Sequence, residues 1–593
     1  FDSRSEFCKS PYGAAPCGGR VTFHVRPLYA EGYSRCVLVA WREFSNSADT
    51  LELMPEGTDG DRTRFSGVLT VPQEPELIWY YFRLFRPDGS TRVFDRSGWR
   101  DDGTPQSWQL TVYEPCPTPR WLSQGVIYQI FPDRYCRLSV PDPTGLVGDR
   151  TVHENWSDCP DWRPDEHGEV RNRDFFGGSL AGITSRLPEL AAMGVTVLYL
   201  NPIFVSPSNH KYDTQDYDYI DPHFAVIVED GGETLADGDN DNSHATKYRK
   251  RVVNKKNLEA SNAFFANFME EVHKRGMRVI IDGVFNHCGS FNKWLDREQL
   301  YESDDSYEKG AFVSEDSPYH DFFQFYPDGS WPYNTHYDGW WGHDTLPKLN
   351  YEGSDKLFEY IMQIGKKWVS APYNVDGWRL DVAADLGHSG KYNHKFWREF
   401  RNAVKEANPE AIVLAEHYGD PSSWLSGDQW DTVMNYDAFM EPVTWFLTGV
   451  DKHSDVSKPE WKGDSGMFFA HMTEYGAKLG MQSYMVALNE LSNHDHSRFL
   501  TRTNGRVGRV ASAGSEAAAF GVKKSVMMAG VMIQMTWPGA PTVYYGDEAG
   551  ICGWTDPDNR RTFPWGKEDK ELFEFHKEMI RIHKDYDVLR TGA

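Results

Sequence analysis

The chain has 593 residues and a formal net charge of −25, because 87 Asp and Glu outnumber 62 Lys and Arg. This length predicts two to four domains at roughly 100–200 residues each, and 40% hydrophobic with 14% aromatic residues excludes a disordered polymer. The negative charge argues against a nucleic-acid partner, and no apolar run reaches the about 18 residues that a membrane span needs.

The start of the chain and the number of its cysteines indicate the cellular compartment of the protein. Phe1 is followed by polar and charged residues rather than by an apolar signal segment. Eight cysteines are too few for a disulfide scaffold. Cys8 and Cys17 could pair, but free thiols in a reducing compartment are the simpler interpretation. We therefore expect a cytoplasmic protein.

The first 118 residues predict a β-sandwich. Short runs of alternating polar and apolar residues recur at 21–25, 36–41 and 78–84, with turn signals such as 87–89 between them. Pro115, Pro117 and Pro119 then suggest a linker. We expect residues 1–118 to form a separate N-terminal domain that resembles a carbohydrate-binding module.

From residue 119 the pattern changes to helices that alternate with short, almost wholly apolar strands. Such strands indicate a parallel sheet that is buried on both faces. Leu572, Phe575, Met579 and Ile582 mark a closing amphipathic helix. Residues 119–593 thus predict an α/β fold, a (β/α)₈ TIM barrel. The candidate strands are 125–131, 195–200, 278–283, 375–380, 411–415, 432–436, 486–491 and 541–545.

Two long insertions enlarge the predicted barrel. Residues 288–350, after the third strand, are rich in Trp, Tyr, Gly and Asp, and we expect them to form an inserted domain B. A second insertion, 225–258, contains the acidic run 237–242 and then a basic run. The acidic run is either a solvated loop or a calcium site, since that ion prefers closely spaced carboxylate and amide oxygens.

Three carboxylic acids follow barrel strands four, five and seven: Asp381, Glu416 and Asp495. Barrel active sites lie at the carboxyl ends of the strands, so these residues can converge. A nucleophile, a proton donor and a further anion are the groups that retaining glycoside hydrolysis needs. Arg379, two residues before Asp381, points to the same side of its strand and can keep Asp381 ionised.

Each of these residues has an ordinary structural alternative. Asp381 could be simply the partner of Arg379 in a structural ion pair, Glu416 could be a surface acid, and Asp495 could cap a helix. A metal-dependent hydrolase is a further alternative, with His287, His494, His496 and Asp381 as candidate ligands. A non-catalytic carbohydrate-binding or transport-linked relative would share the fold without the activity.

The chain resembles the α-amylase superfamily of glycoside hydrolases, family 13, over residues 120–593. The resemblance rests on four motifs in order: DGVFNH (282–287), DGWRLDVA (376–383), LAEHYG (414–419) and SNHD (492–495). It implies Asp381 as nucleophile, Glu416 as general acid and base, and Asp495 as the third carboxylate. It also implies that the cleaved glucose is bound by Tyr212, His287, Arg379 and His494.

Within the superfamily, the chain is similar to the neopullulanase, cyclomaltodextrinase and maltogenic amylase group. LPKLN (346–350), GVIYQIFPDRY (125–135) and the N-terminal sandwich carry this similarity. It implies that Asp556 and Arg560 bind the next glucose toward the non-reducing end. Trp340 and Trp341 are either core residues or a platform for sugar, and we expect Trp341 to contact substrate.

Three departures from this group matter. The loop 137–150 lacks the group's Asn-Gly-Asp calcium ligands and Ser179 replaces an Asp, so we predict no calcium beside the first strand and no required cofactor or metal. Ala384-Asp385 follows where the group commonly has Asn-Glu, which leaves bond preference open. The chain stops at Gly592-Ala593, where relatives begin a C-terminal β-domain, so we expect that this domain is absent.

The predicted function is retaining hydrolysis of α-1,4-glucosidic bonds, with α-1,6 bonds as a further target. The candidate substrates are maltooligosaccharides, cyclodextrins, pullulan and starch, and the alternative is the non-catalytic relative. We expect a monomer or homodimer.

Overall fold

The computed structural model describes residues 1–101, 103–115, 118–139, 144–148, 150–164 and 173–591. Within these ranges, no helix is both long enough and apolar enough to cross a membrane. The chain divides into two compact units, Phe1–Pro117 and Thr118–Ala593. Pro117 of the predicted linker and the terminal pair Gly592-Ala593 lie outside the described residues.

The N-terminal unit is an antiparallel β domain, as its alternating sequence predicts. β4 (Arg35–Arg42) pairs with β7 (Glu76–Phe85) and with the first half of β5 (Ser47–Asp59), whose second half pairs with β6 (Arg62–Thr70). Side chains from both ladders share one buried core, because every second residue of each strand points inward. The other described strands here are β1 (Lys9–Ser10), β2 (Ala15–Pro16), β3 (Arg20–Val25), β8 (Thr91–Asp95), β9 (Gly98–Arg100) and β10 (Trp108–Tyr113).

Eight parallel strands form the centre of the second unit, in the spatial order β20-β19-β18-β17-β14-β11-β22-β21. A parallel bridge between Met434 and Leu488 joins the two ends of this order, so the sheet closes into the predicted barrel. All eight overlap the predicted segments: β11 (Val126–Ile130), β14 (Val195–Leu200), β17 (Arg278–Gly283), β18 (Gly377–Leu380), β19 (Ile412–Ala415), β20 (Thr432–Val433), β21 (Leu488–Glu490) and β22 (Ala540–Tyr544).

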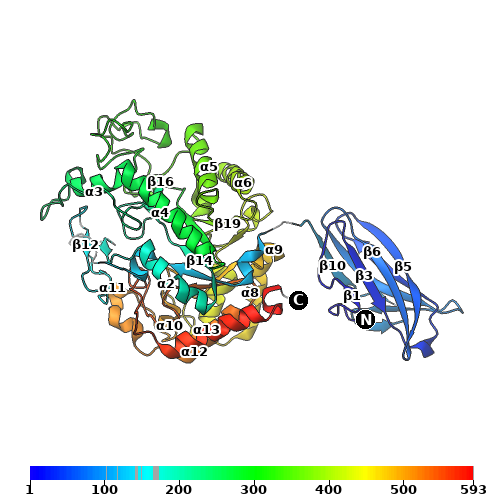
Figure 1. Ribbon diagram of the computed structural model, residues 1–593. Helices are drawn as coiled ribbons and strands as arrows, with labels where there is room; N and C mark the ends of the chain where they lie inside the picture. Colours follow the sequence, from blue (N-terminus) through cyan, green and yellow to red (C-terminus); the bar gives the residue numbers. More distant parts are fainter. Residues whose placement is uncertain (102, 116–117, 140–143, 149, 165–172, 592–593) are drawn as a thin grey trace. The chain divides into compact units, whose positions relative to one another are not determined.

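Helices surround this barrel (Figure 1). Their buried apolar side chains pack with those of the strands in one core. α6 buries Trp397, Phe400 and Val404, and the closing helix α13 buries Leu572 and Met579. The described helices are α1 (Pro132–Tyr135), α2 (Leu180–Met193), α3 (Thr246–Val252), α4 (Lys255–His273), α5 (Asp355–Val369), α6 (Gly390–Ala407), α7 (Glu441–Thr448), α8 (Ser465–Leu479), α9 (Met481–Tyr484), α10 (Phe499–Arg502), α11 (Val510–Ala513), α12 (Lys524–Thr536), α13 (Lys570–Asp585) and α14 (Val588–Thr591).

Long loops leave the barrel after its strands. The segment 288–350 lies between β17 and α5 and contains short 3₁₀ turns, while the segment 225–258 contains a 3₁₀ turn, α3 and the first residues of α4. The sixth strand is shorter than predicted, because the chain enters a π-helix at Tyr436–Met440. Four loop strands complete the described elements: β12 (Thr151–Val152), β13 (Asp174–Phe175), β15 (Phe204–Val205) and β16 (Asp216–Ile220).

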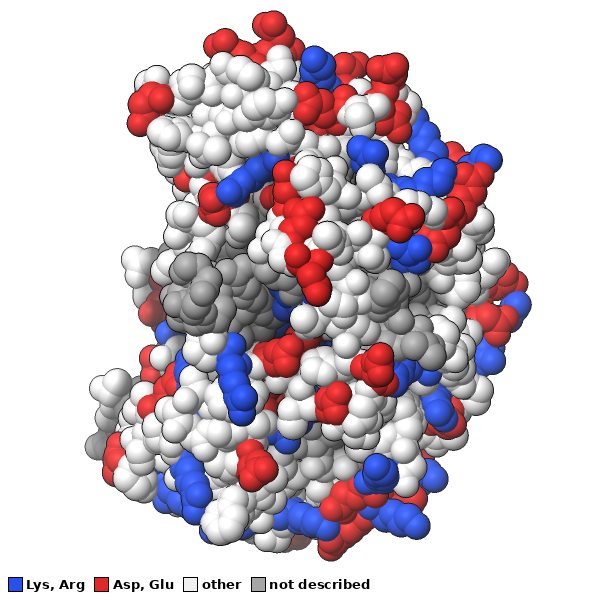
Figure 2. All heavy atoms as spheres, turned by 90° about the vertical axis from the view of Figure 1, so that its left-hand side faces the viewer, with Lys and Arg blue, Asp and Glu red and all other residues white. Residues whose placement is uncertain are grey.

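The surface charge is mixed. On the face drawn in Figure 2, the Lys and Arg side chains that the structure describes lie scattered among Asp and Glu rather than gathered in one basic patch. A scattered arrangement lacks the concentrated positive field that attracts a phosphate backbone.

Candidate active site

The candidate site lies at the carboxyl ends of β17, β18 and β19. Strand register brings its residues together, because Asp282 pairs with Arg379 and Leu380 pairs with Ala415. The backbone N–H of Asp381 donates to Gly283 O at 3.1 Å, and that of Glu416 donates to Leu380 O at 2.9 Å. Asp381 and Glu416 are therefore each held one residue beyond the end of their strand.

Arg379 occupies the centre of the site and is fully buried. Its Nη1 donates to Asp282 Oδ1 at 3.1 Å and to Asp381 Oδ1 at 3.0 Å. Its Nη2 lies 3.1 Å from Glu416 Oε2. One guanidinium thus holds three carboxyl groups from neighbouring strands, which a planar group with five donors is suited to do.

The environment of these carboxyl groups shifts their pKa values upward. Burial raises the pKa of Asp381 well above its usual range, and the charge of Glu416 adds to the effect. Burial also raises the pKa of Glu416, with a further contribution from Asp495. The pKa of Asp282 is raised by burial to about 6, although the Arg379 guanidinium opposes this. The pair Asp381 and Glu416 can therefore hold a proton that an exposed acid would lose.

A strained residue stands between the two buried acids. Val382 has φ +37°, in the left-handed region that β-branched residues rarely adopt. Its backbone N–H donates to Glu416 Oε2 at 3.0 Å. Strain of this kind persists only where the surrounding structure enforces it, and such positions gather at functional sites.

Asp495 follows β21 and is more open to solvent than the other two acids. Its side chain is 34% exposed, and its Oδ1 lies 3.3 Å from Arg560 Nη2. The side chain of Asn493 accepts the backbone N–H of Asp495 at 3.0 Å, which fixes the turn. The third predicted acid therefore lies at the open side of the site.

Two neutral histidines and a tyrosine line the same site. Tyr212 donates from its hydroxyl to Asp282 Oδ2 at 2.9 Å, and that hydroxyl lies 2.7 Å from His494 Nε2. His287 Nε2 donates to the backbone O of Tyr212 at 3.1 Å. Burial lowers the pKa of His287 to about 3 and that of His494 well below its usual value. Both imidazoles are thus uncharged at neutral pH.

The structure places the predicted pair Asp556 and Arg560 differently from the predicted Trp341. Arg560 donates from Nε to the backbone O of His494 at 2.9 Å, and its Nη2 lies 3.7 Å from Asp556 Oδ2. Trp341 is 81% exposed, and the ring contact described for it is with Trp340, at 6.4 Å. Trp340 instead stacks on His287 at 4.9 Å. The structure thus brings Asp556 and Arg560 to the site and leaves Trp341 at the surface.

Known proteins share this architecture. A family model described as the α-amylase catalytic domain matches residues 129–229 and 260–592. The chain belongs to the α-amylase family. Neopullulanase 2 of Thermoactinomyces vulgaris is 33% identical over 567 residues, which cover 94% of this chain and 80% of that protein. A solved cyclomaltodextrinase structure aligns with TM-score 0.61 and 26% identity over 98% of this chain and 84% of that one.

A longer relative covers the whole chain. The amylopullulanase of Thermoanaerobacter thermohydrosulfuricus is 32% identical over 635 residues, which cover 100% of this chain. The chain spans only 39% of the length of that protein. The long amylopullulanase therefore contains a part that resembles this α-amylase-family chain throughout.

The α-amylase-family site contains residues that the sequence analysis did not assign. Tyr199 donates to Asp282 Oδ2 at 2.8 Å, and Gln129 Nε2 lies 3.0 Å from His494 Nδ1. Asp385 accepts from Trp340 Nε1 at 3.0 Å. Tyr199 and Gln129 are polar residues near the carboxyl ends of otherwise apolar strands. Because a buried strand rarely contains polar side chains, their presence there is the sequence signal that could have identified them.

The residues discussed for calcium have other partners. Ser179 caps α2, accepting the Gly182 N–H at 3.2 Å. In the acidic run, Asp239 contacts His244 and Asp241 caps the following 3₁₀ turn. Within the loop 137–150, residues 140–143 and 149 lie outside the described part of the chain. Among described residues, one group could hold a metal ion: His153, Asp161 and Asp174.

Proposed function

We propose that this chain is a retaining α-glucan hydrolase in which Asp381 is the nucleophile and Glu416 the general acid and base. The observation that carries the proposal is the arrangement of Arg379. Its Nη1 hydrogen-bonds Asp381 at 3.0 Å and its Nη2 pairs with Glu416 at 3.1 Å, so one cation holds the two acids side by side. Burial raises the pKa of both carboxyl groups, so the pair can share one proton, and the match to the family's motifs assigns that proton to Glu416 and the negative charge to Asp381.

In the proposed mechanism, Glu416 protonates the glycosidic oxygen while Asp381 attacks the anomeric carbon. The bond to the leaving sugar breaks as the bond to the Asp381 carboxylate forms. Glu416, now ionised, takes a proton from water, and the resulting hydroxide displaces Asp381 from the sugar. Two inversions at one carbon return the α-configuration.

The surrounding groups are proposed to bind the sugar that reacts. Asp495, at the open side, accepts hydroxyl hydrogen bonds and stabilises positive charge at the anomeric centre. His287 and His494 are neutral, so they can accept or donate to hydroxyls without adding positive charge beside the cationic transition state. A non-catalytic relative would have no need to keep this complete set of groups together.

The proposed substrates are short or cyclic α-glucans. The names of the relatives, neopullulanase, cyclomaltodextrinase and amylopullulanase, refer to pullulan, cyclodextrin and amylose-like chains. LPKLN and the pair Asp556 and Arg560 support the same choice. Both α-1,4 and α-1,6 bonds remain candidates, because Asp385 stands where the group has a different residue.

Product analysis tests this proposal. Wild-type protein incubated with pullulan is expected to release panose if it attacks α-1,4 bonds and maltotriose if it attacks α-1,6 bonds. NMR spectra of the first products are expected to show α-anomers. We also expect kcat/KM to be higher on maltotetraose or cyclodextrin than on amylose. Early β-anomers, or a wide preference for long amylose, would contradict the proposal.

Removing the Arg560 side chain should weaken turnover of short substrates. Arg560 is 5% exposed and contacts Asp495, so Arg560→Ala removes a charged donor beside the sugar. We expect kcat/KM on maltotriose to fall by about 10–100-fold, as the loss of a charge-assisted hydrogen bond of about 1.5–3 kcal/mol predicts. Arg398→Ala, an exposed arginine that pairs with Asp428, is the matched control. Equal kinetics for the two variants would exclude the assigned role.

A further inference from the structure

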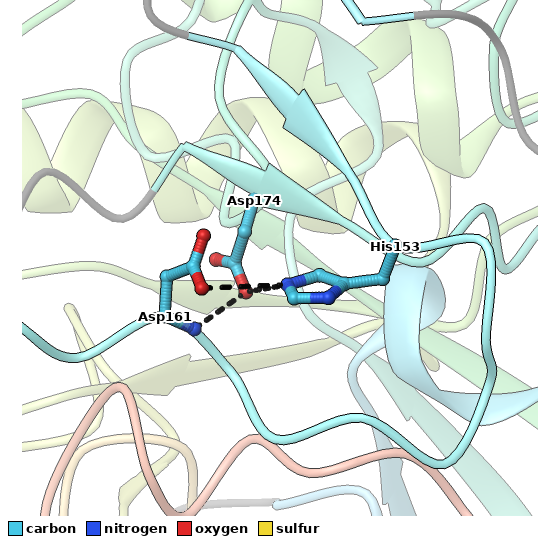
Figure 3. A group of neighbouring side chains, drawn as sticks. All are labelled: His153, Asp161 and Asp174. Atoms are coloured by element: carbon cyan, nitrogen blue, oxygen red, sulfur yellow. Dashed lines mark hydrogen bonds and ion pairs between the residues drawn. The ribbon is translucent and has the colours of Figure 1, made fainter.

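A group of side chains outside the active site has the composition of a metal centre. His153 directly follows β12, and Asp174 lies in β13, which pairs with β12 in parallel register. Asp161 lies on the loop between these strands. Figure 3 shows the three side chains pointing toward one another. Their ligand atoms all lie within 4.8 Å of one another.

The separations fit a tetrahedral ion. His153 Nε2 lies 3.2 Å from Asp174 Oδ2 and 3.8 Å from Asp161 Oδ1. Zinc binds nitrogen and oxygen at about 2.0–2.2 Å, and two ligands of a tetrahedron are then about 3.3–3.6 Å apart. The observed distances lie on either side of that value, so small side-chain adjustments would place all three atoms around one ion.

Neighbouring groups orient these candidate ligands. The other ring nitrogen of His153, Nδ1, lies 3.3 Å from Asp158 Oδ2, and Asn155 holds Asp158 with a hydrogen bond of 2.8 Å. A carboxylate on the far nitrogen is the usual companion of a zinc-bound histidine, because it fixes the tautomer and the ring. The ring also stacks on Phe176, with centroids 4.3 Å apart.

The two oxygens of Asp174 have different partners. Its Oδ1 accepts from Arg134 Nη2 and from Asn209 Nδ2, both at 3.2 Å. Its Oδ2 accepts the backbone N–H of Asp161 at 3.0 Å and faces His153 Nε2, which leaves one lone pair for an ion, and the side chain is fully buried. Arg134 thus orients the carboxylate from behind, as outer partners of metal ligands do.

We propose that His153, Asp161 and Asp174 bind a divalent transition-metal ion of the zinc type, with Asp158 orienting the histidine. Imidazole with carboxylates suits zinc and its neighbours, whereas calcium takes oxygen ligands alone. Three protein ligands leave the fourth position to water.

We assign the site a structural role, because its ligands lie at β12, at β13 and on the loop between them, whereas Asp381 and Glu416 follow β18 and β19. It reaches the substrate side indirectly. Arg134 donates from Nη2 to the backbone O of Asp174 at 3.0 Å and from Nη1 to that of Arg560 at 2.8 Å. By holding Asp174, the ion would thus stabilise the position of Arg134, which hydrogen-bonds the backbone of Arg560.

The test is metal binding by the full chain, purified without a histidine tag and stripped with a chelator. Titration calorimetry with ZnCl₂, checked by equilibrium dialysis and metal analysis, is expected to show one equivalent bound and a higher Tm. His153→Gln and Asp161→Asn should abolish this binding. Asp158→Asn should weaken it by about 10–100-fold. Cobalt-loaded wild type should show the strong visible absorption of a tetrahedral ion.

His244→Gln is the matched control. His244 contacts Asp239 at 3.0 Å and Asp241 at 3.7 Å on an exposed loop, so it offers the same residue types without the buried carboxylate. This variant should bind zinc as the wild type does. Three results would overturn the proposal: no zinc bound by the stripped wild type, undiminished binding by His153→Gln, or calcium bound in place of zinc. Circular dichroism confirms that each variant is folded.

Discussion

Glu416→Gln is expected to lower kcat/KM on maltooligosaccharides by about 10³-fold or more, with no change in fold. Gln has nearly the shape of Glu and can still contact Arg379, but it cannot give a proton to the glycosidic oxygen. General acid–base catalysis is worth about 10²–10⁴-fold, and the proposed mechanism uses Glu416 in both steps. The measurement is steady-state hydrolysis of maltotriose by wild type and variant.

A substrate that needs no acid separates the two assigned roles. Maltosyl fluoride loses fluoride without protonation, so Glu416→Gln should still release fluoride in a burst, whereas Asp381→Asn should not. Since burial raises the pKa of Glu416, wild-type activity on maltotriose should persist above the ordinary range of a glutamate and fall as pH rises through that pKa. The fluoride burst of Glu416→Gln should lack this alkaline limb.

Asp296→Asn controls for the exchange of a buried carboxyl by an amide. Asp296 is fully buried in the loop after β17 and accepts backbone N–H groups of Leu300 and Tyr301. This variant should keep its activity on maltotriose. If Glu416→Gln kept a tenth of the wild-type rate on natural glucans, the acid would have to be another residue.

Arg379→Met is expected to remove most of the activity at neutral pH and to destabilise the barrel. Arg379 is the shared cation of Asp282, Asp381 and Glu416, and removing one partner of a buried ion pair costs about 3–5 kcal/mol of the free energy of unfolding. The guanidinium lowers the pKa of all three carboxyl groups. Without it these pKa values rise further, so the nucleophile is protonated at neutral pH.

The activity of Arg379→Met should change with pH in one direction. Any residual activity of Arg379→Met should increase with pH, because higher pH restores the ionised nucleophile. Arg401→Met is the control: Arg401 Nη1 lies 2.6 Å from Asp431 Oδ1 in another buried pair, and Asp431 keeps Lys405 at 2.8 Å. That variant should lose stability but keep kcat/KM. Denaturant unfolding and pH–rate profiles measure both effects.

The amino-acid sequence by itself determined the family, the barrel and the chain positions of the three acids. This was possible because the information is local. Apolar strands of four to six residues between amphipathic helices identify a parallel barrel, and such a barrel has its chemistry at the carboxyl ends of its strands. The order of motifs then placed Asp381, Glu416 and Asp495 at three of those ends.

Only the tertiary structure decided how these residues act on one another. That Arg379 is shared by three acids follows from the register of β17, β18 and β19, which no pattern in a single strand reveals. The separation of Trp340, stacked on His287, from exposed Trp341 depends on a left-handed turn at Trp341. Neighbouring tryptophans look alike in sequence, whereas backbone direction gives them different surroundings.

The group formed by His153, Asp161 and Asp174 likewise could not be predicted from the sequence. Asp161 and Asp174 lie 8 and 21 positions after His153, a spacing that matches no familiar metal motif. They meet because β12 and β13 pair and because Arg134, from the short helix after β11, holds the Asp174 carboxylate. Contacts made by loop pairing and by a distant cation depend on the folded chain, so sequence spacing alone cannot predict them.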